Sequence, residues 1–298
     1  MTAAVETRGL GKRYRSRWAL SDCTLSIPTG RVVGLVGPNG AGKTTLLSLA
    51  VGLLSPTSGS ITVLGAEPAA TGRQMGRIGF VAQETSLYSS LTVADHLQLG
   101  AHLNPGWDND LAHRRLELVD LDLDQLAGSL SGGQKAQVAL TLAIAKRPEL
   151  LILDEPVASL DPLARREFLQ VLMETVADGD VSVVLSSHNV ADLERICDYL
   201  VVLVSSRVQV DGEIEKLLAS HHRLIGPRRA LATLPKNQQV IESSHTDRQT
   251  TLLVRTEVPI LDPRWTVEPV GLEDLVLAYM RQARAVRMAV LGIQPCCG

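Results

Sequence analysis

The chain has 298 residues, which is enough for one large α/β domain with a smaller appendage or for two domains. It carries 29 basic and 32 acidic residues and only 3% aromatic residues, a composition that argues against a nucleic-acid partner. No apolar run reaches the roughly 18–20 residues that cross a bilayer, and the N-terminus has no apolar signal core. We therefore expect a cytoplasmic protein.

The first elements lead into a phosphate-loop motif. Strands are expected at residues 5–10 and 20–27, where apolar and polar residues alternate, and a basic turn at 12–15 joins them. An apolar strand follows at 31–36. The next residues read GPNGAGKTT and fit the pattern G-x-x-x-x-G-K-[ST]. The glycines let backbone N–H groups turn inward, and the following helix, expected from about Gly42, adds its positive end. A chance match in a Gly-rich turn is the alternative, but the flanking strand and helix argue against it.

The motif predicts a nucleotide site and gives individual roles to its residues. Lys43 is expected to reach the β- and γ-phosphates, and the Thr44 hydroxyl to ligate Mg²⁺. The predicted ATP-binding residues of the loop are Gly37, Pro38, Asn39, Gly40, Ala41, Gly42, Lys43, Thr44 and Thr45.

A helical segment interrupts the strands in the middle of the chain. Short strands are expected at residues 60–64 and 77–82, and the second ends at Gln83. Thr92 is a helix cap, and two helices without an intervening strand follow, so residues of about 85–145 are predicted to form an inserted all-helical subdomain. The sequence LSGGQ at 130–134 opens a helix that runs to about residue 146. A serine and two glycines at a helix start make a second anion-receptive site.

Three further strands follow, and two of them lead into polar residues at their C-terminal ends. The apolar strand at 150–155 ends in Asp154 and Glu155, and the strand at 181–185 leads to His188, before a third strand at 199–204. Alternating strands and helices predict a parallel sheet, whose strand C-termini carry ligands. We expect Asp154 to hold Mg²⁺, Glu155 to activate the attacking water and His188 to reach the γ-phosphate. A helix cap for the acidic pair and a structural role for His188 are the alternatives.

The remainder is predicted to be a small α+β appendage. A helix is expected at 213–219, strands near 240 and at 250–254, and a last helix at 272–287. We divide the chain into an ATP-binding domain at 1–223 and an accessory region at 224–298, with a disordered tail from 292. The cysteines Cys23, Cys197, Cys296 and Cys297 lack metal-ligand spacing and are expected to stay reduced.

The order of these motifs resembles one family. Over roughly residues 5–215 the chain carries, in this order, the phosphate loop, FVAQE, LSGGQ, LLILDEP, SLD and SSH. This order resembles that of the nucleotide-binding subunit of an ABC transporter. The resemblance implies a P-loop NTPase parallel-sheet core with an N-terminal antiparallel β subdomain. In this family the LSGGQ motif, called the signature, of one subunit closes over the ATP held by another subunit. The chain departs from many relatives after LSGGQ, where Lys135-Ala136-Gln137 stands and an arginine is absent.

The resemblance also assigns roles to individual residues. Tyr14 would stack on adenine, although a half-buried strand tyrosine is equally compatible with its position, and Gln83 would contact Mg²⁺ and sense the permease. His188 would act as the γ-phosphate switch. Five residues would complete the ATP site of another copy in trans, namely Ser131, Gly132, Gly133, Gln134 and Asp161.

We therefore expect an ATPase subunit that powers solute translocation through a separate transmembrane permease, as a homodimer or heterodimer on the inner face of the cell membrane. Residues 267–275 resemble the tails of export-type subunits, so export is the expected direction. Leu87, Tyr88 and the start of the helix capped by Thr92 are the expected permease dock, with Leu91 in the core. A soluble ABC-type ATPase acting on ribosomes or DNA is the alternative, and a P-loop GTPase is disfavoured because Asn-Lys-x-Asp is absent.

Overall fold

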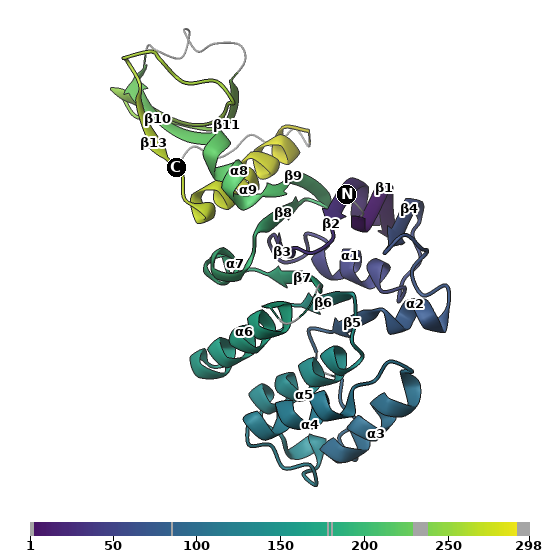
Figure 1. Ribbon diagram of the computed structural model, residues 1–298. Coiled ribbons are helices and arrows are strands. Elements are labelled where there is room, and N and C mark those ends of the chain that lie inside the picture. Colours follow the sequence, from purple (N-terminus) through teal and green to yellow (C-terminus); the bar gives the residue numbers. More distant parts are fainter. Residues whose placement is uncertain (1–2, 85, 178, 180, 229–237, 291–298) are drawn as a thin grey trace.

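The computed structural model describes residues 3–84, 86–177, 179, 181–228 and 238–290 (Figure 1). The predicted disordered tail from residue 292, with Cys296 and Cys297, lies outside these residues. No helix in the described part of the chain is both long and apolar enough to span a membrane.

A six-stranded sheet in the order β5-β6-β7-β3-β8-β9 forms the centre of the molecule. All strands but the edge strand β9 are parallel, which confirms the predicted parallel core. Its strands are β3 (Val32–Val36), β5 (Ile78–Val81), β6 (Leu150–Asp154), β7 (Ser182–Ser187), β8 (Tyr199–Val204) and β9 (Arg207–Glu213). Most of their residues are buried, because helices cover both faces of the sheet. The C-terminal ends of the parallel strands therefore meet at one edge.

An antiparallel sheet in the order β2-β1-β4 packs beside this core, as predicted for the N-terminal subdomain. It consists of β1 (Ala3–Tyr14), β2 (Arg17–Pro28) and β4 (Ser58–Val63). The helix α1 (Lys43–Ala50) shares one apolar cluster with both sheets, and the short helix α2 (Gly72–Gly76) follows β4. The basic turn expected at residues 12–15 is shorter than predicted, because β1 continues through Tyr14. The hairpin consequently carries Tyr14 and Arg17 at its tip.

The inserted segment is helical, as predicted. It contains α3 (Val93–Leu103), α4 (Asn109–Leu118), the 3₁₀ turn η1 (Ala127–Ser129) and α5 (Gly132–Ala145). Thr92 starts α3 with a capping box in which its side chain and that of Asp95 exchange hydrogen bonds. The three α-helices enclose their own apolar cluster, whereas Leu91, expected in the core, is only half-buried.

The C-terminal region forms a second antiparallel sheet in the order β11-β12-β10-β13. Its elements are β10 (His221–Pro227), β11 (Gln239–His245), β12 (Gln249–Arg255), β13 (Thr266–Pro269) and the helix α9 (Leu272–Val290). The helices α6 (Pro162–Ala177), α7 (Val190–Ile196) and α8 (Ile214–Ser220) precede this region. Strand β10 directly follows α8 and crosses the division predicted between residues 223 and 224. Figure 1 shows α9 between this sheet and the central one, far from the helical subdomain.

Candidate functional site

The phosphate loop connects β3 to α1 and is tightly enclosed by the protein. Gly40 and Gly42 have φ angles of 76° and 112°, a region that favours glycine. A Cβ on Gly37 would lie 2.0 Å from the carbonyl oxygen of Leu203 in β8, and one on Gly42 would lie 2.4 Å from that of Ala19. The glycines of the motif are therefore needed for backbone contact as well as for backbone conformation.

A cleft of about 610 Å³ lies against this loop. It is bounded by the tip of the β1–β2 hairpin, the start of α1 and the segments that follow β5, β6 and β7. The lining residues are Tyr14, Arg17, Ala19, Asn39, Gly40, Ala41, Gly42, Lys43, Thr44, Thr45, Gln83, Glu155, Ala158 and His188. The structure thus brings together most of the residues predicted to bind ATP in cis. Three lining residues had no predicted role, namely Arg17, Ala19 and Ala158. Of these, only Arg17 could have been suspected from the sequence, because it extends the run of basic residues at 12–15.

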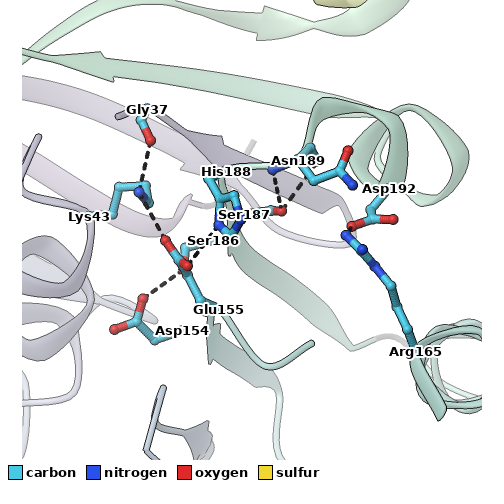
Figure 2. Close-up of polar contacts among 10 residues, drawn as sticks. All are labelled: Gly37, Lys43, Asp154, Glu155, Arg165, Ser186, Ser187, His188, Asn189 and Asp192. Atoms are coloured by element: carbon cyan, nitrogen blue, oxygen red, sulfur yellow. Dashed lines mark hydrogen bonds and ion pairs between the residues drawn. The ribbon is translucent and has the colours of Figure 1, made fainter. Parts of the chain in front are cut away.

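Lys43 and Glu155 form a buried ion pair at the base of the cleft (Figure 2). The Lys43 Nζ atom lies 3.1 Å from Glu155 Oε1 and donates to the Gly37 carbonyl oxygen at 2.8 Å. Their side chains are only 5% and 9% exposed. Burial by itself raises the pKa of Glu155, but hydrogen bonds from Lys43 and His188 outweigh it and hold that pKa below its ordinary value. Glu155 is therefore a carboxylate at neutral pH, as a general base must be.

Ser186 connects the two acidic residues to the neighbouring strand. Asp154 pairs with Ser186 in the parallel register of β6 and β7. The Ser186 hydroxyl donates to Asp154 Oδ1 at 2.7 Å and accepts from the Glu155 amide at 2.8 Å. Glu155 itself has a φ of 45°, which is uncommon for a residue other than glycine, and its side chain contacts Lys43 at the end of the loop. No role was predicted for Ser186, because its contacts arise only when the two strands pair.

His188 engages the second carboxylate oxygen of Glu155. Its Nδ1 atom donates to Glu155 Oε2 at 2.9 Å, while 57% of its side chain stays exposed. Lys43, Glu155 and His188 consequently converge on one cleft although they come from three different segments of the chain (Figure 2).

The three residues expected to hold Mg²⁺ are placed differently. Thr44 and Gln83 are exposed and line the cleft, whereas Asp154 is buried and is not among the residues that line it. Hydroxyl, amide and carboxylate oxygens suit Mg²⁺, which usually keeps several waters and binds through substrate phosphates. Among the described residues, no group of three or more His, Cys, Asp or Glu could hold a metal ion without such help.

The residues expected to act in trans lie outside this cleft. Ser131 and Gly132 are exposed at the start of α5, where the side chains of Ser131 and Gln134 form a capping box. Asp161 Oδ1 accepts hydrogen bonds from the amides of Leu163 and Ala164 at the start of α6. The geometry leaves these residues on the surface, and their role in trans remains a prediction.

This phosphate loop, with a carboxylate pair and a histidine at the ends of adjacent parallel strands, defines a P-loop ATPase. A family model described as ABC transporter matches residues 20–158. The chain is 36% identical over 203 residues to the thiamine import ATP-binding protein ThiQ of Shigella flexneri serotype 5b, covering 66% of this chain and 87% of that protein. It is 35% identical over 227 residues to the phosphonates import ATP-binding protein PhnC of Chromohalobacter salexigens, covering 70% and 84%. A solved structure of the ATP-binding subunit of an ABC transporter superposes with a TM-score of 0.66 at 31% identity, covering 72% of this chain and 92% of that one.

These findings show that the chain belongs to the ABC transporter family, as one of its ATP-binding proteins. It is an ATPase coupled to transport, as the resemblance of its motifs implied. Both named relatives are import proteins, so the expected export direction finds no support in them.

Proposed function

We propose that Glu155 is the general base for ATP hydrolysis and that the energy drives a solute through a separate membrane permease. The observation that carries this proposal is the meeting of Lys43, Glu155 and His188 in the cleft beside the phosphate loop.

The Lys43–Glu155 pair suggests how nucleotide binding prepares the reaction. Lys43 now contacts Glu155 and the Gly37 carbonyl oxygen, both acceptors on the protein. The phosphates of ATP would compete for the same ammonium group, because a phosphate is a stronger acceptor than a backbone carbonyl. Once Lys43 turns toward the phosphates, the Glu155 carboxylate is free to accept a proton from water, while His188 keeps it oriented through Nδ1.

The proposed Mg²⁺ site combines the first turn of α1 with the ends of two strands, β5 and β6. Thr44, Gln83 and Asp154 would hold the ion, with Asp154 acting through water because of its burial. When bound, Mg²⁺ would neutralise charge on the β- and γ-phosphates. Ser186 already donates to Asp154 Oδ1 and would fix the orientation of that carboxylate.

A second copy, or a related chain, would supply the charge compensation that this cleft lacks on its open side. The exposed start of α5, with Ser131 at its N-cap, has the positive end of a helix dipole available for a phosphate. Two-fold pairing would bring each α5 to the other copy's cleft. Asp161, at the neighbouring start of α6, would then lie between the two sites.

The permease is proposed to dock near Tyr88. This side chain is 64% exposed and stacks on His96 at 6.1 Å between ring centroids, whereas Leu87 packs partly into the helical subdomain. The names of the relatives favour import over the export expected from the C-terminal tail. We therefore propose import as the direction, with the solute selected by the permease.

Two experiments test the proposal. A Glu155→Gln protein should bind ATP and hydrolyse almost none, and wild-type turnover by that variant would contradict the assignment of the base. Purification from detergent-solubilised membranes should recover an integral membrane protein with this chain. Recovery with ribosomes or DNA instead would favour the soluble alternative.

A further inference from the structure

A second cavity of about 340 Å³ adjoins the ATP cleft and shares Glu155 and His188 with it. Its opposite wall is one face of the C-terminal helix α9, formed by Glu273, Val276, Leu277 and Met280. These positions recur every three or four residues, as side chains on one side of a helix do. Helix α9, which lies outside the residues 20–158 that the family model matches, thus borders the space next to Glu155 and His188.

The segment that carries His188 depends on the helix that follows it. The Asn189 amide donates to Ser187 Oγ at 3.0 Å, and Asn189 Oδ1 accepts from the Ala191 amide at the start of α7. More than half of the His188 side chain is exposed, and its ring makes a polar contact with Glu155. The place of His188 is therefore set from both sides, by β7, which ends at Ser187, and by α7, which begins at Val190.

Helix α7 in turn depends on α9. It has only seven residues, too few for a helix to be stable without packing. Its Val190 and Leu193 lie in the same apolar cluster as Leu272 and Val276 of α9. On its other sides α7 packs against Gly34 of β3 through Leu193 and pairs with α6 through Asp192 and Arg165.

Helix α9 is also held to the C-terminal sheet by packing and ion pairs. Ile241 of β11 and Leu253 of β12 belong to the cluster that α9 joins. Arg281 of α9 pairs with Glu242 at 2.8 Å, and Asp274 pairs with Arg223 of β10 at 2.7 Å. A packed path therefore runs from the C-terminal sheet through α9 to α7, the helix that follows His188 along the chain.

We propose that α9 positions His188 for hydrolysis and so links the turnover of ATP to the C-terminal sheet. The proposal rests on the role of His188 in the proposed function. Met280 and Leu277 are the positioning residues, because both are half-buried at the cavity and touch no nucleotide site. Val276 is fully buried, so its truncation would test the stability of the fold instead.

The test compares full-length variants by steady-state ATPase activity, equilibrium ATP binding and thermal unfolding. Met280→Ala should lower kcat about tenfold, the scale of a small displacement of a catalytic group, with the KM for ATP changed by less than about twofold. Met280→Leu should restore turnover, because it refills the same volume. Val286→Ala, which removes an exposed side chain of the same helix, should behave as wild type.

Several outcomes would overturn the inference. One is a kcat for Met280→Ala equal to that of Val286→Ala, and another is a loss of kcat fully matched by a loss of ATP-binding stoichiometry. If Met280→Ala does not fold, Leu277→Ala carries the same test. His188→Ala separates the two proposals. If it hydrolyses ATP at the wild-type rate, the role given to His188 in the proposed function fails, whereas an inactive His188→Ala beside a fully active Met280→Ala overturns only the positioning role of α9.

Discussion

Lys43 Nζ lies 3.1 Å from Glu155 Oε1, so the residue predicted to hold phosphate contacts the residue predicted to activate water. The two are separated by more than a hundred residues of sequence and meet because β3 and β6 flank β7 in the sheet. The pairing makes the lysine a partner of the base until a nucleotide arrives.

Lys43→Met should weaken ATP binding strongly. A hydrogen bond to a charged group contributes about 1.5–3 kcal/mol, so the Kd for ATP should rise by about 10- to 150-fold. Isothermal titration calorimetry measures the change. Lys216→Met, which removes an exposed lysine remote from the cleft, is the control. Unchanged affinity in Lys43→Met would contradict the phosphate contact.

Tyr14→Ala should weaken the binding of every purine nucleotide. Base stacking contributes about 1–3 kcal/mol per base, which corresponds to a rise in Kd of about 5- to 150-fold. Tyr14→Phe should keep the wild-type affinity, because the ring is retained. Tyr88→Ala is a matched control, since Tyr88 is an exposed tyrosine outside the cleft. Equal affinities for Tyr14→Ala and Tyr88→Ala would assign Tyr14 a purely structural role.

Mixing two inactive variants should restore hydrolysis. Lys43→Met inactivates the cis half of each site, and Ser131→Arg blocks the trans half. In an equal mixture, half of the dimers are mixed and each has one intact composite site, so about a quarter of the wild-type rate is expected for independent sites. Each variant alone provides the baseline. A mixture no more active than the separate proteins would argue against composite sites.

Most of the residues that line the cleft could be named from the sequence, because they follow each other in short motifs. A loop such as GPNGAGKTT encodes its own backbone shape, and Asp154 and His188 stand at recognisable strand ends. Arg17 and Ser186 could not be predicted in the same way. Arg17 reaches the cleft only because the hairpin folds over the loop, and Ser186 gains its role from strand pairing with β6.

The C-terminal region was harder to predict for the same reason. Strand β10, which was not predicted, begins at His221, a polar residue that is fully buried. Its partner Tyr279 is 58 positions away, so no local pattern shows why His221 is tolerated there. The four-stranded sheet and the packing of α9 likewise depend on long-range contacts.

His221 should make the stability of the protein depend on pH. Burial lowers the pKa of His221 below its ordinary value of 6.5, against the hydrogen bond to the Leu217 carbonyl oxygen, which raises it. The neutral ring donates from Nδ1 to that oxygen at 2.6 Å and accepts from the Tyr279 hydroxyl at Nε2 at 2.9 Å. Below about pH 6.5 the unfolded chain therefore binds more protons than the folded one. The free energy of unfolding consequently decreases as the pH is lowered.

The measurement is thermal unfolding between about pH 7.5 and 5, a window that spans the ordinary histidine pKa. His221→Gln should flatten the decline that the wild type shows below about pH 6.5. His222→Gln is the control, because this neighbouring histidine is only half-buried. An unchanged slope in His221→Gln would show that other groups cause the pH dependence.

Gly100→Ala should destabilise the helical subdomain. A Cβ at this position would lie 2.5 Å from two ring atoms of Trp107, which packs across α3. Overpacking of this kind costs about 1–3 kcal/mol, visible as a lower denaturant midpoint by tryptophan fluorescence. Gly76→Ala is the control, since that helical glycine has open space around it. Equal midpoints for the two variants would contradict the steric argument.

The contact of Gly37 with Leu203 has a consequence for the kinetics of ATP binding. The backbone of β8 lies directly against Gly37 at the start of the phosphate loop, although β8 contributes no residue to the lining of the cleft. The loop is thereby shaped before a nucleotide arrives, so association involves no step in which the loop must first become ordered. The on-rate should then depend on diffusion and on access to the open side of the cleft.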